Sequence, residues 1–199
     1  MKRIITITGE FGGGSHIIGQ RLAERLGYGF YNKKLVMQVA EQTGFDPSFI
    51  DDHGKFGTYE DGFSYIFTNL GMRPTAQASP SEVLWNVQQD VILRLAEAGS
   101  CVIIGRCADF ILRERTDVLN AFIYAPRWKR LERIQKYPIY GEIKDPDKKL
   151  KDKDKRRSAK YRQRTGQEWA NRENYHVLLD SGALTMDRCV DVLELLAKA

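Results

Sequence analysis

The sequence predicts an α/β fold in which helices flank a parallel β-sheet. Short apolar runs rich in Ile and Val alternate with segments whose apolar residues recur at helical spacing. The strand-like runs are apolar at nearly every position, which is typical of strands buried on both faces. Such an alternation builds a parallel sheet between layers of helices, with ligand sites at the carboxyl ends of the strands.

The composition is that of an ordinary globular domain. The chain has 199 residues, about one domain, with 42% hydrophobic and 29% charged residues, which excludes a disordered chain. No run approaches the roughly 18 apolar residues of a membrane span. The three cysteines include no C-x-x-C pair and indicate neither a disulfide framework nor a cysteine zinc site. We therefore expect a cytoplasmic protein that does not contact a membrane.

The first half of the chain begins with a β-branched run over residues 3–8, which predicts a strand that ends in a glycine-rich loop. Apolar residues at helical spacing then predict a helix over residues 16–26, and a glycine ends it. A short extended piece over residues 29–32 and a helix over residues 33–43 follow. Residues 45–80 are rich in Gly, Asp, Phe and Tyr with weak periodicity, which indicates an inserted region.

The second half continues the alternation. Ser81 is expected to cap a long helix over residues 82–98, whose apolar residues share one face. Further strands are expected over Cys101–Ile104, 118–125 and 175–179, and further helices over 108–114, from near Pro126 onward, and over 185–198.

The loop after the first strand carries the clearest chemical signal. Glycines let backbone N–H groups approach a phosphate closely, and the following helix start favours an anion. The pattern G-x-x-x-x-G-K-[ST] is matched at Gly9 and Gly14, but Ser15 takes the lysine position and His16 the next. We predict a nucleotide site formed by Gly9, Gly12, Gly13, Gly14, Ser15 and His16. The alternatives are a tight turn without a ligand and, for His16, a solvated residue at the helix start.

The positive charge of the chain is concentrated in one segment. The whole chain has a net charge of +5, but residues 144–164 contain eleven Lys and Arg against four Asp, a net charge of +7. On a helix, Arg157 and Tyr161 would share a face, so several guanidinium groups could close together over phosphates. The alternatives are a solvated charged face and a surface that tracks a nucleic-acid backbone.

Arg106 follows Gly105 at the carboxyl end of a buried-type strand, where α/β sheets place ligands. Its guanidinium suits a phosphate, and the alternative is a structural ion pair. His53 and His176 show no ligand spacing with carboxylates or cysteines, so no metal site of the protein's own is predicted.

Several segments together resemble the cytidylate kinase-like proteins, relatives of the P-loop nucleoside monophosphate kinases. The likeness runs nearly end to end but is weak over residues 45–80. It is carried by residues 4–19, 30–35, 102–106, 161–169 and 179–185, which read IITITGEFGGGSHIIG, FYNKKL, VIIGR, YRQRTGQEW and LDSGALT.

The resemblance implies a P-loop NTPase-type fold with a five-stranded parallel sheet. It also implies a single kinase-like domain over residues 1–199, in which an NMP-binding insert occupies about residues 36–80 and a basic lid about residues 141–172. ATP would donate its γ-phosphoryl group to CMP or a similar acceptor, and Mg²⁺ would arrive with the nucleotide.

The same resemblance implies roles for individual residues. Arg157, Arg162 and Arg164 of the lid would be catalytic, because phosphoryl transfer depends on positioning and on stabilising phosphate charge. Asn32, Arg106 and Asp109 would bind the acceptor nucleotide.

Three positions depart from working cytidylate kinases. In those kinases a lysine occupies the position of Ser15, a hydroxyl residue the position of Ile17 and an aspartate the position of Asn32.

The function expected first is a nucleotide kinase. The alternatives are a nucleotide-binding protein with little turnover, because Ser15 replaces the lysine, and a basic nucleic-acid-binding module. The acceptor and the oligomeric state are left open by the sequence.

Overall fold

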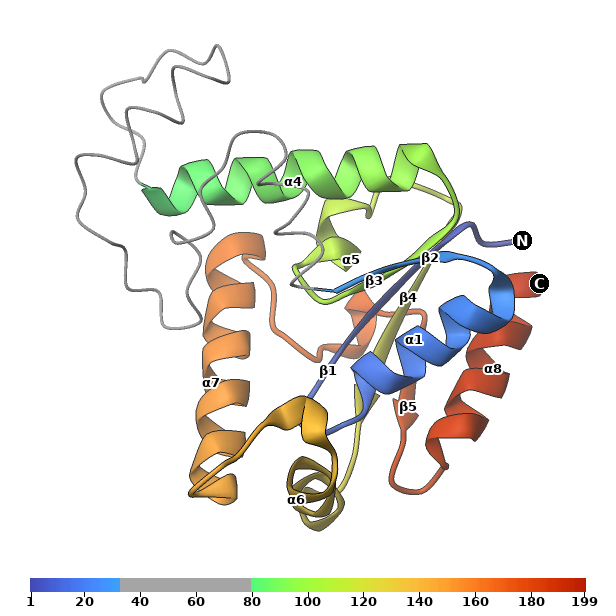
Figure 1. The fold of residues 1–199 in the computed structure, drawn as a ribbon. Coiled ribbons are helices and arrows are strands. Elements are labelled where there is room, and N and C mark those ends of the chain that lie inside the picture. Colours follow the sequence, from blue (N-terminus) through green and yellow to red (C-terminus); the bar gives the residue numbers. More distant parts are fainter. Residues whose placement is uncertain (33–79) are drawn as a thin grey trace.

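A computed structural model describes residues 1–32 and 80–199 (Figure 1). The helix expected over residues 33–43, most of the expected insert and His53 lie outside the described residues. The strands are β1 (Ile4–Gly9), β2 (Gly29–Tyr31), β3 (Cys101–Ile104), β4 (Val118–Tyr124) and β5 (Val177–Asp180). The helices are α1 (Ser15–Leu26), α4 (Pro80–Ala98), α5 (Ala108–Ile111), α6 (Arg127–Lys136), α7 (Pro146–Thr165) and α8 (Met186–Lys198), with short 3₁₀ turns η2 (Pro138–Tyr140) and η3 (Arg172–Asn174).

In the described residues the strands form one parallel five-stranded sheet in the order β2-β3-β1-β4-β5. Strand β1 lies in the centre, where Ile4 is in register with Cys101 on one side and Val118 on the other. Both the α/β class and the five-stranded parallel sheet predicted above are confirmed.

Alternate residues of each strand face opposite sides of the sheet and build two cores. Helices α1 and α8 cover one face, which carries Ile5 and Ile7, while α4 and α5 cover the other, which carries Ile4 (Figure 1). These isoleucines are fully buried, as the continuous apolar pattern of β1 predicted.

Helices α6 and α7 lie at the end of the sheet where the strands finish, and both chain termini lie at the opposite end (Figure 1). The basic segment forms the 20-residue helix α7. Asp145 caps its start by accepting a hydrogen bond from the Lys148 N–H, Pro146 begins it, and Gly166 ends it in the left-handed region.

Three predicted boundaries differ from the structure by two residues or more. Helix α4 begins at Pro80 and not at 82, so Ser81 lies inside its first turn; the fixed φ of proline suits that first position. Helix α5 ends at Ile111 and not at 114, because the chain turns back through a bond from the Arg115 N–H to the Leu112 carbonyl. Strand β5 begins at Val177, since the Tyr175 N–H is bonded within a 3₁₀ turn.

Candidate functional site

The glycine loop lies between the end of β1 and the start of α1, and its backbone requires glycine. Gly14 has a φ of +98°, in the left-handed region that favours glycine. A Cβ at Gly9 would lie 2.2 Å from the carbonyl oxygen of Ile123 on β4. The loop is therefore packed tightly against the central strands, with its glycines as a structural necessity.

The start of α1 offers unused backbone donors. Gly14 is the N-cap and makes no side-chain cap. Within residues 1–32 and 80–199, the N–H groups of Gly14, Ser15 and His16 have no hydrogen-bond acceptor. Free N–H groups at the positive end of a helix dipole are what a phosphate binds in a P-loop. The Ser15 hydroxyl donates to the Thr8 carbonyl over 3.4 Å.

Arg157 of α7 supplies a cation to this loop. Its Nη1 donates to the carbonyl oxygen of Gly9 over 2.7 Å, and its guanidinium carbon lies 5.6 Å from the centre of the Phe11 ring. Of the three arginines expected to be catalytic, Arg157 is placed against the predicted nucleotide loop. The Arg162 side chain is 70% exposed and pairs with Glu168, and Arg164 lies 5.6 Å from the ring centre of Trp85 on α4.

His16 connects the loop with Asn32, a residue expected on the acceptor side. The His16 Nε2 and Asn32 Nδ2 atoms are 3.1 Å apart, and the His16 ring packs edge-on against Phe30. Burial lowers the pKa of His16, so the imidazole is neutral at physiological pH. Its Nδ1 is buried without a hydrogen-bond partner among the described residues. His16 is thus held at the loop rather than solvated.

The chain turns sharply after β3, where Arg106 was predicted to face the acceptor. Arg106 and Cys107 both have positive φ, +62° and +55°. Gln88 of α4 donates to the Arg106 carbonyl over 2.8 Å. Non-glycine residues in this region cost free energy and persist where surrounding contacts hold them, often at functional sites. The burial of Cys107 raises the pKa of its thiol to about 12, so it is not a reactive thiolate.

Asp109 joins the acceptor-side turn to the basic helix. The Tyr161 hydroxyl donates to Asp109 Oδ2 over 2.6 Å, and both residues are buried. Burial raises the pKa of the Asp109 carboxyl, while the bond from Tyr161 opposes that rise. The sequence predicted that Arg157 and Tyr161 share one face of α7. In the structure, Arg157 contacts the glycine loop and Tyr161 contacts α5.

Sequence reasoning missed Arg133 of α6. It is 5% exposed, and its guanidinium donates to the Gly13 carbonyl over 2.9 Å and to the Ser181 carbonyl over 2.6 Å. The Ser181 hydroxyl in turn donates to the Gly13 carbonyl over 2.5 Å. No local signal could have found it, because adjacent residues of a helix point in different directions and the apolar Ile134 beside it therefore does not show where Arg133 points.

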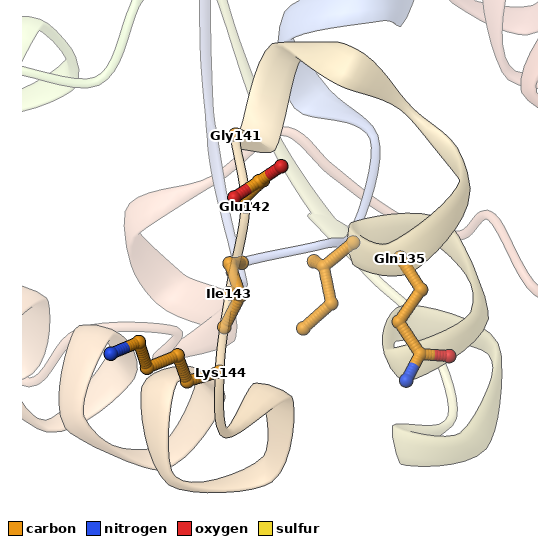
Figure 2. A pocket seen from close by; sticks show the side chains of 6 residues that line it. Gln135, Gly141, Glu142, Ile143 and Lys144 are labelled. Atoms are coloured by element: carbon orange, nitrogen blue, oxygen red, sulfur yellow. The ribbon is translucent and has the colours of Figure 1, made fainter.

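A cavity of about 410 Å³ lies between α6 and the segment that leads into α7 (Figure 2). Gln135 of α6 faces the segment from Gly141 to Lys144, which leads into α7 (Figure 2). Ile134 lines the cavity and also lies 3.0 Å from where a Cβ of Gly12 would be. None of the predicted site residues lines it, so the glycine loop and not this cavity is the candidate site.

Among the described helices, none is long and apolar enough to cross a bilayer.

Solved structures show the same fold at low identity. The crystal structure of an uncharacterized protein from Eubacterium ventriosum matches with a TM-score of 0.73 and 22% identity, covering 98% of each chain. A shikimate kinase from Acinetobacter baumannii in complex with shikimate matches with a TM-score of 0.53 and 18% identity over 98% of this chain and 93% of that one. A shikimate kinase from Bacteroides thetaiotaomicron matches with a TM-score of 0.52 and 16% identity over 98% of both.

Comparison with the curated proteins found no match. The model of the cytidylate kinase-like family matches residues 4–183, which include the glycine loop, the Arg106 turn, α7 and β5. The fold is that of P-loop kinases, and the match spans most of the chain. This protein belongs to the cytidylate kinase-like family.

Proposed function

We propose that this protein is an ATP-dependent phosphotransferase whose acceptor is a nucleoside monophosphate such as CMP. The observation that carries the proposal is the guanidinium of Arg157 at the carbonyl of Gly9, because it brings a cation to a loop that has Ser15 in place of lysine. Family membership and the P-loop kinase fold support the same class of reaction.

The residues of the loop fit a nucleotide phosphate. The N–H groups of Gly14, Ser15 and His16 have no hydrogen-bond acceptor in the described part of the chain and lie at the positive end of α1. ATP supplies the transferred phosphoryl group, and Mg²⁺ held by its phosphates and by water neutralises part of their charge. The loop binds and orients the donor, and Arg157 stabilises the charge that spreads over the phosphate oxygens in the transition state.

The acceptor side of the proposal uses Asn32, Arg106 and Asp109. Asn32 contacts His16 of the loop, so it stands next to the donor site. Arg106 follows β3, the strand beside β1, and its guanidinium suits the acceptor phosphate. Arg162 and Arg164 lie further along α7 and complete the proposed set of lid cations.

The test is ADP release from MgATP with a panel of acceptors: CMP, dCMP, UMP, AMP, GMP and shikimate, the last because it is bound in a structural neighbour. We expect turnover with CMP or a close analogue, and a large loss in Arg157→Ala. Lys151→Gln is the matched control, since Lys151 is an exposed cation of the same helix. Turnover with shikimate alone would contradict the proposed acceptor.

A second candidate is a nucleotide-binding protein with little turnover. The Ser15 hydroxyl is bonded to the end of β1, and a serine carries no charge to a donor phosphate. Binding of MgATP without ADP release for any acceptor would select this function.

A nucleic-acid-binding module is supported less well. Base stacking needs exposed aromatic rings near the basic surface. Near the basic helix α7, Tyr161 is buried against Asp109, and the Trp169 ring packs edge-on against Phe122. Trp128 is exposed but lies on α6. Salt-dependent binding of oligonucleotides without phosphotransfer would favour this third function.

A further inference from the structure

Arg130 of α6 lies at the centre of an ion cluster that joins three parts of the site. Its Nη1 lies 2.5 Å from Asp154 Oδ2 of α7, and its Nε lies 3.3 Å from Glu10 Oε2 of the glycine loop. The Arg130 side chain is 10% exposed and that of Asp154 is 19% exposed. An ion pair so shielded from water is screened by salt much less than a surface pair.

Asp154 also bonds the loop backbone directly. Its Oδ1 accepts a hydrogen bond from the Phe11 N–H over 2.8 Å. Asp154 therefore uses one oxygen for the loop and the other for Arg130, so its position is fixed from two sides. Glu10 is held as well, because its carboxylate accepts from the Ala125 N–H at the end of β4.

Asp154 and Arg157 are three residues apart on α7 and so lie on the same face of the helix. Asp154 contacts Phe11, and Arg157 contacts Gly9, two residues earlier in the same loop. A helix held at Asp154 carries the Arg157 guanidinium to the loop with little freedom to move away. Asp147 on the same helix pairs with Lys151 and with Arg127 of α6, but these pairs are more exposed and do not contact the loop.

We propose that Arg130 and Asp154 are positioning residues: they hold α7 on the glycine loop before the nucleotide binds, and so fix Arg157 beside Gly9. The role of Arg157 in transfer rests on the proposed function above, whereas the docking of α7 does not. As a consequence, we expect the Arg157 guanidinium to be in place already in the nucleotide-free protein. The binding of ATP then needs no further ordering of α7.

The first measurement is amide hydrogen exchange in the nucleotide-free protein. Asp154→Asn and Arg130→Met should raise exchange in α7 by about tenfold or more, because local opening no longer breaks the ion cluster. Asp147→Asn is the control: it removes the same charge from the same helix but loses only exposed pairs, with Lys151 and Arg127. Asp154→Asn keeps an amide oxygen for the Phe11 N–H, and its thermal unfolding shows whether the fold is intact. Unchanged exchange in both variants of the cluster overturns the proposal.

The second measurement asks whether the cluster acts through Arg157. A double-mutant cycle compares Arg157→Ala, Asp154→Asn and both together, read as kcat and as the KM for ATP. We expect kcat to fall about tenfold in Asp154→Asn with little change in KM, and the second substitution to add little to the first. If the effects of the two substitutions on the activation free energy are fully additive, the positioning role is overturned. If the wild type proves to have no turnover, only the proposed function fails, and the hydrogen exchange of α7 still decides whether the cluster holds the helix on the loop.

Discussion

At the scale of single residues, the glycine loop differs from the P-loop pattern by the absence of its lysine. The glycine loop of this chain has Ser15 at that position, and the Arg157 guanidinium that contacts Gly9 comes from a helix more than a hundred residues further along. A cation contributes to catalysis through its position at the transferred phosphoryl group and not through its place in the sequence. Under the proposed function, Arg157 and a lysine at position 15 would be alternative sources of the same charge.

This equivalence predicts a rescue. Arg157→Ala should lower phosphotransfer by about a hundredfold or more, as removal of a transition-state cation does. Ser15→Lys in that background should restore part of the rate, while Ser15→Lys in the wild type should add less. Steady-state ADP release from the four proteins is the measurement. A Ser15→Lys variant that is inactive in both backgrounds would show that the side chain at position 15 has no room to reach the donor phosphates.

The sequence predicted the loop at this scale but not everything that supports it. The glycine spacing is local, so it could be read directly. Arg130 and Arg133 were missed because a basic residue on a helix is usually solvated, whereas here both are buried under the loop. Contacts that join residues more than a hundred positions apart, such as Arg133 with Gly13, depend on the packing of α6 and are not encoded in any local pattern.

At the scale of elements, α5 and α7 meet at the buried pair of Asp109 and Tyr161. Helix α5 is short, and its carboxylate lies in the first turn, where the helix dipole favours a negative charge. Burial nevertheless dominates and raises the pKa of this carboxyl. The alternation of strands and helices was predictable from periodicity, but the contact between α5 and α7 was not. Tyr161 and Asp109 are far apart in the sequence, and each looks like an ordinary surface residue of an amphipathic helix.

The raised pKa gives a prediction with a definite sign. In the unfolded chain Asp109 ionises near pH 3.8, and in the folded protein it ionises at higher pH. The folded state therefore binds more protons between the two values, and the wild type loses stability as the pH rises through that interval. The Asp109→Asn variant has no such loss, so its free energy of unfolding relative to wild type should rise from about pH 4 upward. The rise is about 1.4 kcal/mol for each unit by which the pKa of Asp109 in the folded protein exceeds that in the unfolded chain.

Urea unfolding between pH 4 and pH 8 measures this difference. Tyr161→Phe is the opposite control: it leaves the carboxylate buried without its donor, so its stability relative to wild type should fall as the pH rises. A difference between Asp109→Asn and wild type that is independent of pH would contradict the assignment of the pKa shift to Asp109.

At the scale of the whole molecule, the parallel sheet brings the site together. Strands β1, β3 and β4 lie side by side, so the loop after β1, the turn after β3 and the end of β4 meet at one edge. This arrangement follows from the fold class and was predictable. The placement of α7 against that edge was expected only in outline, because its charge pattern fits a solvated face equally well and only the tertiary contacts of Asp154, Arg157 and Tyr161 distinguish the two.

A ligand that binds only the folded site should stabilise the whole domain. At a concentration about 100 times its Kd, MgATP would add about 2.7 kcal/mol, which for a chain of this size is a rise in Tm of about 5 to 10 °C. Gly14→Asp should abolish this rise, because a carboxylate would stand at the cap of α1, where the proposed donor-phosphate site lies. Gly14→Ala is the control for strain, since any side chain at a φ of +98° and 2.9 Å from the Met186 sulfur destabilises the loop. We expect the alanine variant to have a lower Tm but a remaining shift with MgATP, and the aspartate variant to have none. An equal shift in Gly14→Asp and wild type would place the nucleotide elsewhere on the molecule.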